Sequence, residues 1–324
     1  MDAARELHRL ASGYQVTQAI HVAARLGISD VLADGPRSVA ELAAATKTDA
    51  QALTRLMHAL TVLGLYSVSA DRYENTELGA ALRSEAPRSL AGWARFIGRG
   101  SHWQAYTGLE DSIRTGTTAF PAMHGEPVWE YRAKRPEEQA AFDAAMTSAS
   151  DGLAEAVVTA YDFGRFATVV DIGGGHGRLL NAILTRYPAV NGVLFDQPDV
   201  VAGAGTGRFE VVGGNFFESV PVGDALVLKS VIHDWADAES IDILRVCRRS
   251  LPADGRLLLV EQLLDRSPDP LRTAFADLNM LIMTGGRERT TDEYRTLLAA
   301  ADLELVDTVS TASMPFVIEA AATR

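Results

Sequence analysis

The chain has 324 residues, a formal net charge of −12 and 47% hydrophobic residues, which predicts about two domains with a large buried core. The acidic charge argues against nucleic acid or an anionic membrane surface as the main partner, and no run approaches the roughly 18 apolar residues of a membrane span. Cys247 is the only cysteine, which excludes an internal disulfide, and residues 1–14 carry charges where a signal peptide is apolar, so a cytoplasmic location is expected.

The first 90 residues predict helices followed by a hairpin. Apolar residues recur at helical spacing over residues 7–26. Ser38 is expected to cap a second helix together with Glu41, three positions further on. A third helix over 49–63 and a strand, turn and strand over 65–76 follow. Three helices and a hairpin are typical of a winged helix.

Two functions fit this segment, a DNA-binding module or a surface for packing and dimerisation. Residues 36–83 carry five basic side chains (Arg37, Lys47, Arg55, Arg72 and Arg83) and five acidic ones (Glu41, Asp49, Asp71, Glu74 and Glu77). A helix that neutralises phosphates is expected to be clearly positive, whereas the net charge here is zero. The apolar face of the first helix also needs cover. The balance favours a homodimer, with DNA binding as the alternative.

From residue 167 the pattern changes to strands that alternate with helices, after a helical and aromatic-rich connector over 91–160. Near-continuous apolar strands separated by helices indicate a parallel sheet that is covered on both faces. A closing hairpin predicts an antiparallel pair at its edge. We therefore expect one domain over 1–92 and a second over 93–324 that includes the connector. The expected strands cover 168–172, 192–196, 209–212, 224–228, 256–261, 303–306 and 316–320.

A glycine-rich loop follows the first of these strands, at residues 173–177. Such a loop lets a ligand approach the backbone, although a tight turn produces the same pattern. Dinucleotide binding is disfavoured because Arg178 takes the place of the third glycine in G-x-G-x-x-G. Asp171 before the loop suits a cationic ligand, and Asp196 at the next strand end can accept both ribose hydroxyls. The pattern indicates an adenosyl ligand with positive charge and no phosphates, a description that fits S-adenosylmethionine.

At this point the sequence resembles the plant-type and bacterial small-molecule O-methyltransferases over nearly the whole chain. The resemblance implies an α/β fold: a Rossmann-like methyltransferase domain with a mostly parallel seven-stranded sheet and an antiparallel C-terminal edge hairpin. A mostly helical winged-helix dimerisation domain would precede it and supply part of the partner's pocket wall. The segments that carry the resemblance are 170–177, 195–198, 213–217, 228–235 with its His-Asp-Trp, and 285–290, which reads Gly-Gly-Arg-Glu-Arg-Thr.

The resemblance also implies a site for S-adenosylmethionine, which would leave as S-adenosylhomocysteine. Asp196 would bind the ribose, and Asn215 and Phe216 would flank the adenine. The family usually has Asp where this chain has Asn215, but an amide carbonyl still accepts from an amino group, so we expect somewhat weaker binding. Lys229 would lie near the cofactor, with a solvated strand-end lysine as the alternative. The residues assigned to the cofactor are Asp171, Gly173, Gly175, Asp196, Gln197, Asn215, Phe216, Lys229 and Ser230.

For catalysis, a neutral phenol with a pKa near 10 is a poor nucleophile, so a positioned base is expected. His233 follows a predicted strand that also carries Lys229, and open α/β sheets build their sites at such strand ends. The family's base matches His233, and its matching carboxylates, Glu261 and Glu288, would orient the imidazole. Glu288 has a second interpretation as a surface charge, because arginines flank it. No metal is predicted.

The resemblance points to an acceptor pocket built from both halves of the chain. Phe142 and Met146 lie one helical turn apart and would share a face, although plain helix core explains them nearly as well. Trp103 is a weaker candidate. The residues assigned to the acceptor are Trp103, Phe142, Met146, Trp235, Asn279, Met280 and Met283.

These observations predict an S-adenosylmethionine-dependent O-methyltransferase that acts on a hydroxyl of a small aromatic acceptor, in the manner of enzymes of secondary metabolism. Three alternatives stay open. The first is methyl transfer to a nitrogen of an aromatic heterocycle. The second is a family member that keeps the cofactor but no longer methylates, such as a hydroxylase or a cyclase. The third is a DNA-binding regulator that uses the N-terminal segment.

Overall fold

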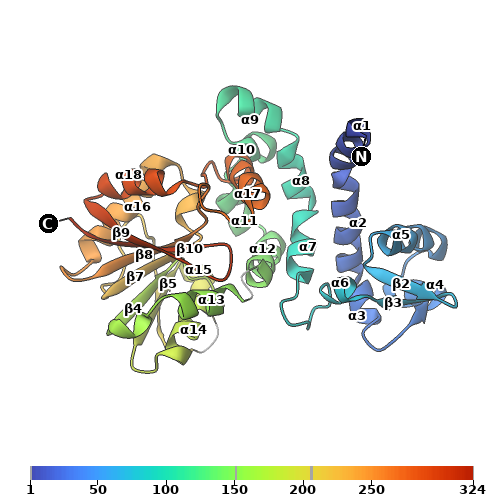
Figure 1. Cartoon of the computed structure of the whole chain (residues 1–324), viewed down its shortest axis with the longest axis horizontal. Coiled ribbons are helices and arrows are strands. Elements are labelled where there is room, and N and C mark those ends of the chain that lie inside the picture. The colour runs from blue at the N-terminus through green and yellow to red at the C-terminus, as the bar shows by residue number, and fades with distance from the viewer. Residues whose placement is uncertain (1, 150–151, 205–206, 324) are drawn as a thin grey trace. The chain divides into compact units, whose positions relative to one another are not determined.

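A computed structural model describes residues 2–149, 152–204 and 207–323, which form two compact units (Figure 1). One unit comprises Met1–Thr107 and Trp129–Asp151, and the other comprises Gly108–Val128 and Gly152–Arg324. This division cuts the chain at other positions than the boundary predicted between residues 92 and 93. The reason is that α12 (Pro136–Ala149) packs along α7 (Ala91–Ile97), so that the second part of the connector returns to the N-terminal unit.

The N-terminal unit is mostly helical, with a small three-stranded sheet in the order β1-β3-β2. The capping box predicted at Ser38 is present, because its hydroxyl accepts from the Glu41 amide while the Glu41 carboxylate accepts from the Ser38 amide at 2.6 Å. The prediction of one helix over 7–26 is wrong, because Ser12 ends one helix and begins another. The elements are α1 (Ala3–Ala11), α2 (Gly13–Leu26), α3 (Ile28–Val31), β1 (Arg37–Ser38), α4 (Val39–Thr46), α5 (Ala50–Val62), β2 (Tyr66–Ser69), β3 (Arg72–Asn75), α6 (Glu77–Ala80), α7, α8 (Gly100–Tyr106), α11 (Val128–Ala133) and α12.

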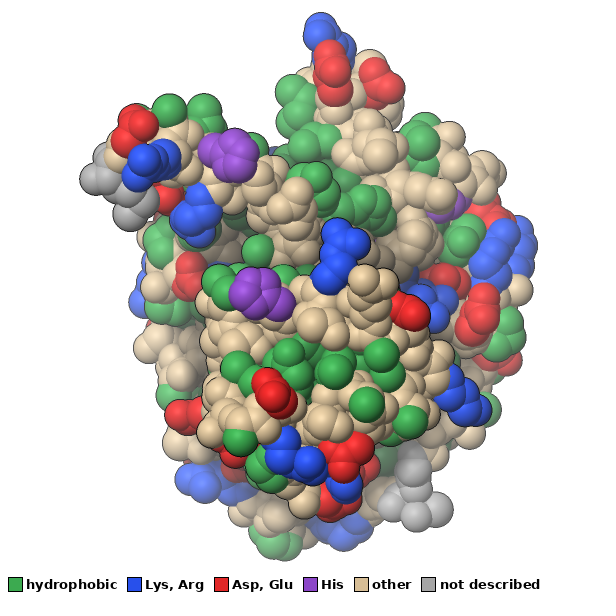
Figure 2. All heavy atoms as spheres, turned by 90° about the vertical axis from the view of Figure 1, so that its right-hand side faces the viewer, with side chains coloured by type: hydrophobic (Ala, Val, Ile, Leu, Met, Phe, Trp, Pro, Cys, Tyr) green, Lys and Arg blue, Asp and Glu red, His purple; other side chains and the backbone are tan. Residues whose placement is uncertain are grey.

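The exposed side chains of the N-terminal unit bear on the choice between DNA binding and dimerisation. On the face that Figure 2 shows, basic and acidic side chains alternate, with hydrophobic side chains between them. The first two helices expose large apolar side chains, including Leu7, Leu10 and Tyr14, which are 68%, 60% and 55% exposed. An apolar face without a basic patch fits contact with another protein surface better than contact with phosphates.

The C-terminal unit is built on a seven-stranded sheet in the order β6-β5-β4-β7-β8-β10-β9, as the α/β prediction requires. The first five strands in this order pair in parallel, and β10 runs antiparallel between β8 and β9. The strands are β4 (Thr168–Ile172), β5 (Asn191–Asp196), β6 (Glu210–Gly213), β7 (Ala225–Lys229), β8 (Arg256–Glu261), β9 (Leu303–Ser310) and β10 (Phe316–Ala322).

Helices cover the sheet because its strands are apolar on both faces. Side chains of β4 alternate between two clusters of the core, with Val170 and Ile172 in one and Val169 in the other. The helices of this unit are α9 (Leu109–Thr115), α10 (Ala119–His124), α13 (Leu153–Ala160), α14 (Arg178–Arg186), α15 (Pro198–Val201), α16 (Asp237–Ser250), α17 (Pro270–Met283) and α18 (Thr291–Ala299), with short 3₁₀ turns η1 (Phe163–Arg165) and η2 (Ile232–Asp234).

Strand order predicts a ligand site at the carboxyl ends of the central strands of this sheet. The chain leaves β4 for β5 on one side and later enters β7 on the other, so the connections reverse direction between β4 and β7. Ligands of open α/β sheets bind at the carboxyl ends of the strands at such a switch point. No helix in the described ranges is both long enough and apolar enough to cross a membrane.

Candidate active site

The glycine loop leaves β4 at the switch point and lies against the end of β5. The amide of Gly173 donates to the Phe195 carbonyl at 2.8 Å, and the amide of Gly175 donates to the Asp196 carboxylate at 2.9 Å. Gly173 has a φ of +68°, and a Cβ there would come within 2.8 Å of a Val231 methyl carbon. Only glycine satisfies both conditions without strain. The loop is therefore seated directly on the segment that leads from β7 into η2.

Asp171 lies beneath this loop as a buried carboxylate that is 1% exposed. Among the described residues, no donor reaches its carboxylate oxygens with ordinary hydrogen-bond geometry, although the Leu180 amide lies near enough to lower the pKa of this carboxyl. Burial raises the pKa of Asp171 to about 6, Asp196 adds to this effect, and Lys229 opposes it. An ionised carboxylate in such a place gains from a nearby positive charge. Asp171 therefore suits a cationic ligand better than an anionic one.

Lys229 ends β7 as a half-buried side chain, not as a fully solvated one. Burial lowers its pKa, and the charges of Asp171 and Glu261 oppose that effect. The next residue, Ser230, has a φ of +55° and donates its amide to the Val260 carbonyl at 3.1 Å. A left-handed serine is uncommon, and such strain concentrates at functional sites.

The residues expected beside adenine follow β6. The Asn215 side-chain carbonyl accepts from the Phe217 amide at 3.0 Å, and its amide nitrogen donates to Glu218 at 3.2 Å. Asn215 thus holds its own turn together. The Trp235 ring meets Phe216 and Phe217 edge-on, with ring centroids 5.9 and 4.8 Å apart. Trp235, which the sequence assigned to the acceptor, therefore contacts the residues assigned to the adenine.

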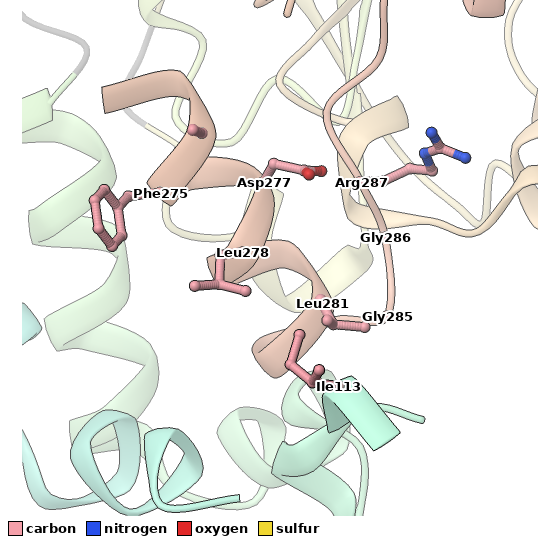
Figure 3. A pocket seen from close by; sticks show the side chains of 9 residues that line it. Ile113, Phe275, Asp277, Leu278, Leu281, Gly285, Gly286 and Arg287 are labelled. Atoms are coloured by element: carbon pink, nitrogen blue, oxygen red, sulfur yellow. The ribbon is translucent and has the colours of Figure 1, made fainter. Parts of the chain in front are cut away.

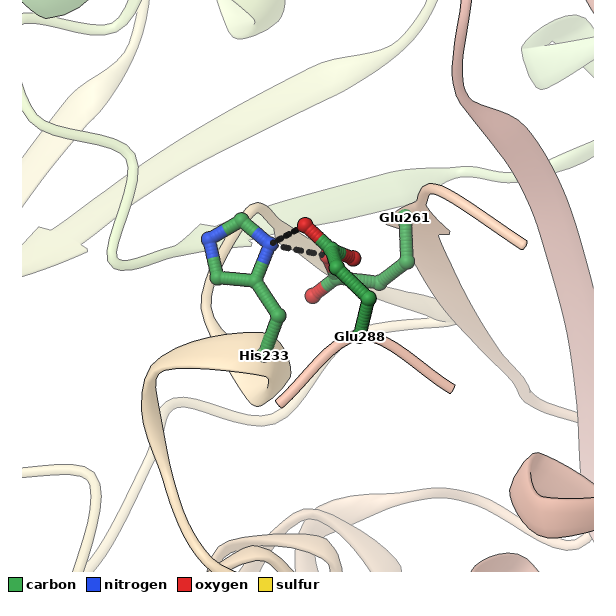
Figure 4. Close-up of side chains that lie close together, drawn as sticks. All are labelled: His233, Glu261 and Glu288. Carbon is green, nitrogen blue, oxygen red and sulfur yellow. Dashed lines mark ion pairs between the residues drawn. The ribbon is translucent and has the colours of Figure 1, made fainter. Parts of the chain in front are cut away.

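His233 lies in η2 and turns one nitrogen toward two buried carboxylates (Figure 4). Its Nδ1 is 3.1 Å from an oxygen of Glu261 and 3.4 Å from an oxygen of Glu288. The imidazole is 15% exposed, whereas the two carboxylates are buried. Burial by itself would lower the pKa of His233, but the charges of Glu261, Glu288 and Asp234 outweigh burial and raise it well above 6.5.

Hydrogen bonds hold the Glu261 carboxylate and the Glu288 backbone in place. Glu261 accepts from the amides of Val231 and Ile232 at 3.1 and 2.9 Å, so β8 is joined to η2. The Glu288 amide donates to the Asp277 carboxylate on α17 at 2.9 Å. Glu288 is only 1% exposed, so the interpretation as a surface charge is wrong. That interpretation rested on the flanking arginines, of which Arg287 is exposed and Arg289 is buried.

The three side chains offer donor atoms within 4.8 Å of one another, a spacing that is also compatible with a bound metal ion. The same spacing serves a histidine that is oriented by carboxylates. The prediction that no metal is needed therefore stays a prediction, and removal of metal ions tests it.

The residues assigned to the acceptor are divided between the two units. Asn279, Met280 and Met283 lie on α17 in the C-terminal unit, where Met283 is buried and the other two are half-buried. In the N-terminal unit, the Phe142 ring packs edge-on against Phe96 and Trp129, with centroids 5.8 and 5.7 Å apart. Met146 and Trp103 are half-buried in the same unit, and the Trp103 ring lies 6.4 Å from that of Tyr14.

A separate groove of about 610 Å³ opens on the C-terminal unit (Figure 3). Ile113 lines it from α9, Phe275, Leu278 and Leu281 from α17, and the backbone of 285–287 closes one side. The α17 side chains that line this groove lie on a different face of the helix from Asn279, Met280 and Met283, the residues assigned to the acceptor. His233, Glu261 and Glu288 do not line this groove, although Asp277, which accepts from the Glu288 amide, does.

Sequence reasoning missed two buried polar side chains. Arg289 is 1% exposed and joins η2 to the loop before α18. His102 is 4% exposed, and neither of its ring nitrogens has a hydrogen-bond partner within the described ranges. The Arg-Glu-Arg pattern around Glu288 contained the first signal, but only Glu288 was assigned a role, with a surface charge as its alternative.

Comparison with known proteins adds two family matches. Residues 8–85 match the O-methyltransferase dimerisation domain, and residues 106–304 match the O-methyltransferase domain. A phenazine O-methyltransferase of Lysobacter antibioticus is 41% identical, over 97% of this chain and 95% of that protein. An 8-amino-8-demethylriboflavin N,N-dimethyltransferase of Streptomyces davaonensis is 37% identical, over 94% of this chain and 91% of that protein. The crystal structure of human N-acetylserotonin methyltransferase in complex with S-adenosylmethionine is also similar. The match covers 100% of this chain and 99% of the human chain, with 29% identity and a TM-score of 0.93.

Proposed function

Because the chain belongs to the family of S-adenosylmethionine-dependent O-methyltransferases with a dimerisation domain, we propose that it methylates a hydroxyl of a small aromatic acceptor with His233 as the general base. The observation that carries this proposal is the contact of one nitrogen of His233, just after β7, with two buried carboxylates, Glu261 at the end of β8 and Glu288 in the loop before α18. That contact leaves the other nitrogen, Nε2, for the acceptor.

The residues around the switch point fit the cofactor. When bound, S-adenosylmethionine supplies a methyl group on a positively charged sulfur. Asp171 offers a buried carboxylate, and the Gly173 loop packs so closely on Val231 that a side chain there would collide. Asp196 would accept from the ribose hydroxyls, with Gly175 and Gln197 holding the carboxylate in place. Phe216, Asn215, Lys229 and Ser230 complete the proposed site.

His233 would remove the proton of the acceptor hydroxyl. A proton on Nδ1 stays between Glu261 and Glu288, and Nε2 receives the second proton. The imidazolium that forms is stabilised by both carboxylates, which makes His233 a stronger base than an ordinary histidine. The same carboxylates keep more of the resting imidazole protonated at neutral pH. The rate should therefore rise with pH until the imidazole is neutral, with a midpoint above 6.5.

Formation of S-adenosylhomocysteine with a panel of phenols tests this function. His233→Ala should lower turnover about 10²–10⁴-fold, the usual contribution of a general base. His58→Ala, which removes an exposed histidine from α5, is the matched control and should leave turnover unchanged. The deficit of His233→Ala should shrink for more acidic phenols, because they ionise without help. Near-normal turnover of His233→Ala on a weakly acidic phenol would contradict the proposal.

Methyl transfer to nitrogen is the second candidate, because the riboflavin-type relative is an N,N-dimethyltransferase. A neutral aromatic nitrogen already carries its lone pair and needs no base for attack. Full turnover of an aromatic amine by His233→Ala would support this candidate. No S-adenosylhomocysteine from any acceptor in a broad panel would instead indicate a family member that keeps the cofactor without methylating.

The family also supports a homodimer formed through the N-terminal domain. We propose that residues 1–92 act as the dimerisation domain and that 93–324 carry the connector and catalysis. The acceptor pocket is proposed to use Asn279, Met280 and Met283, with Phe142, Met146, Trp103 and Trp235 as further candidates. Mutation of Met280 should change which acceptors are used, with little effect on cofactor binding.

A further inference from the structure

The groups that form the proposed base lie on three separate segments of the C-terminal unit. His233 is in η2, Glu261 ends β8, and Glu288 lies in the loop before α18. A shift of about 1 Å in such a constellation can cost roughly 10²-fold in rate. The relative positions of η2, β8 and this loop must therefore be fixed by contacts between them.

Arg289 contacts the segment of His233 on both sides. Its Nη1 donates to the Ile232 carbonyl at 3.2 Å, and its Nη2 donates to the Trp235 carbonyl at 2.9 Å. These two carbonyls belong to the residues that begin and follow η2. A planar guanidinium can serve two such acceptors at once, whereas the single nitrogen of a lysine cannot hold the same fork.

Arg289 is also joined to the other two segments. Its Nη1 donates to the Arg287 carbonyl at 3.3 Å, which fixes the backbone on the far side of Glu288. Its own carbonyl accepts from the Leu264 amide at 3.1 Å, and a parallel bridge links Arg289 to Leu263, directly after β8. Through backbone and side chain together, this one residue connects all three segments of the cluster.

A carboxylate on α16 holds the guanidinium in place. Asp237 accepts from Nε at 3.0 Å and from Nη2 at 2.7 Å, and the Ser240 hydroxyl lies 3.3 Å from Nη2. The Arg289 side chain is only 1% exposed, so losing these partners would leave a buried charge unpaired. Neutralising the charge of Arg289 needs only the Asp237 carboxylate, whereas the guanidinium also donates to three backbone carbonyls.

We propose that Arg289 is a positioning residue, which sets the place of His233 relative to Glu261 and Glu288. This inference rests on the proposed function, since it concerns the same base. Arg289 acts through backbone carbonyls, and the proposed roles give it no contact with the acceptor or the cofactor. Its removal should therefore change the chemistry step and the ionisation of His233, and should spare cofactor binding.

Arg289→Lys tests the inference, because lysine keeps the positive charge but loses the fork. We expect kcat to fall about 10- to 100-fold, with the Kd of S-adenosylhomocysteine and the KM of the acceptor within about twofold. The charged groups that face His233 are Glu261, Glu288 and Asp234, and they raise its pKa. If η2 moves away from the two glutamates, the acid limb of the pH–rate profile should move to lower pH. A purely structural role would lower Tm without moving that limb.

Arg287→Lys is the matched control. Arg287 lies on the other side of Glu288, is exposed and pairs with Glu293. It should keep the kcat and the pH profile of the parent enzyme. Asp237→Asn is the second variant, and it leaves Arg289 in place while weakening its support. It should shift the acid limb in the same direction with a smaller loss of kcat, and it keeps the test open if Arg289→Lys folds poorly.

A double-mutant cycle separates this inference from the proposed function. Arg289→Lys should have almost no further effect on kcat in a His233→Ala background, since its effect acts through the imidazole. A full additional loss in that background, or an unchanged pH profile in both Arg289→Lys and Asp237→Asn, would overturn the inference. If His233→Ala alone kept normal turnover on weakly acidic phenols, the proposed function would fail instead.

Discussion

Glu288→Gln removes one charge from the cluster and keeps its shape. The glutamate oxygen that faces His233 also accepts from the Gln262 side chain at 3.3 Å, and a glutamine carbonyl can accept the same bond. At the 3.4 Å between Nδ1 and this oxygen, the Coulomb attraction is about 1–5 kcal/mol for effective dielectric constants of about 80 to 20. Glu261 stays in place at 3.1 Å from Nδ1.

Two consequences with opposite signs follow from this loss of charge. The pKa of His233 falls toward its usual value, so the base form is present at lower pH and the acid limb moves in that direction. The weaker base removes the hydroxyl proton less readily, so the plateau at high pH falls. If about half of the lost attraction is felt in the transition state, the plateau falls roughly 3- to 60-fold. This loss is smaller than that expected for His233→Ala.

Initial rates of S-adenosylhomocysteine formation across a range of pH, with a weakly acidic phenol, measure both quantities. At neutral pH the two effects partly cancel, so a single assay at pH 7 underestimates the role of Glu288. Binding of S-adenosylhomocysteine is the control and should not change. A plateau that falls while the acid limb stays in place would refute the electrostatic reasoning and would leave Glu288 with a steric role.

Four further predictions concern the cofactor, the assembly, the fold and metal ions. Asp196→Ala should abolish most of the rise in Tm that S-adenosylhomocysteine causes, because it unpairs the ribose hydroxyls, and an unchanged rise would mean that the ribose site is elsewhere. The intact chain should scatter light as a dimer, and Leu10→Glu on α1 should shift it toward monomers, whereas a monomeric parent would exclude the dimer. Burial lowers the pKa of His102 to about 4, followed by a smaller effect of Arg132, so folding opposes its protonation and the stability of the parent should fall as the pH drops from 6.5 toward 4. In urea unfolding, the free energy of unfolding of His102→Leu should fall by up to about 3 kcal/mol less than that of the parent over this pH range. An equal pH dependence of the parent and the variant would refute the lowered pKa of His102. Dialysis against a chelator should leave methyl transfer unchanged, and a loss that Zn²⁺ or Mg²⁺ restores would show that the His233 cluster needs a metal ion.

Much of this protein could be predicted from local sequence, because the relevant forces act over a few residues. The capping box of Ser38 and Glu41 depends on hydrogen bonds within one turn, and the strands of the parallel sheet depend on short apolar runs. The glycine loop after β4 was predicted because close approach to a backbone demands glycine. His233 and Glu261 were predicted mainly from the resemblance to the O-methyltransferases, and their positions at the ends of such strands supported the assignment.

Other features depended on residues far apart in the chain, and only the tertiary structure decided them. Glu288 and Arg289 look like a solvated charge pattern in sequence, yet both are buried, because α16, α17 and η2 close over the loop that carries them. The pKa of His233 is raised by two carboxylates, 28 and 55 positions away in sequence, that lie near the same nitrogen. Burial and the distances between charges set a pKa, and both are properties of packing. The sequence alone could therefore indicate candidate residues for the chemistry, whereas their protonation and their support depend on how distant segments pack around them.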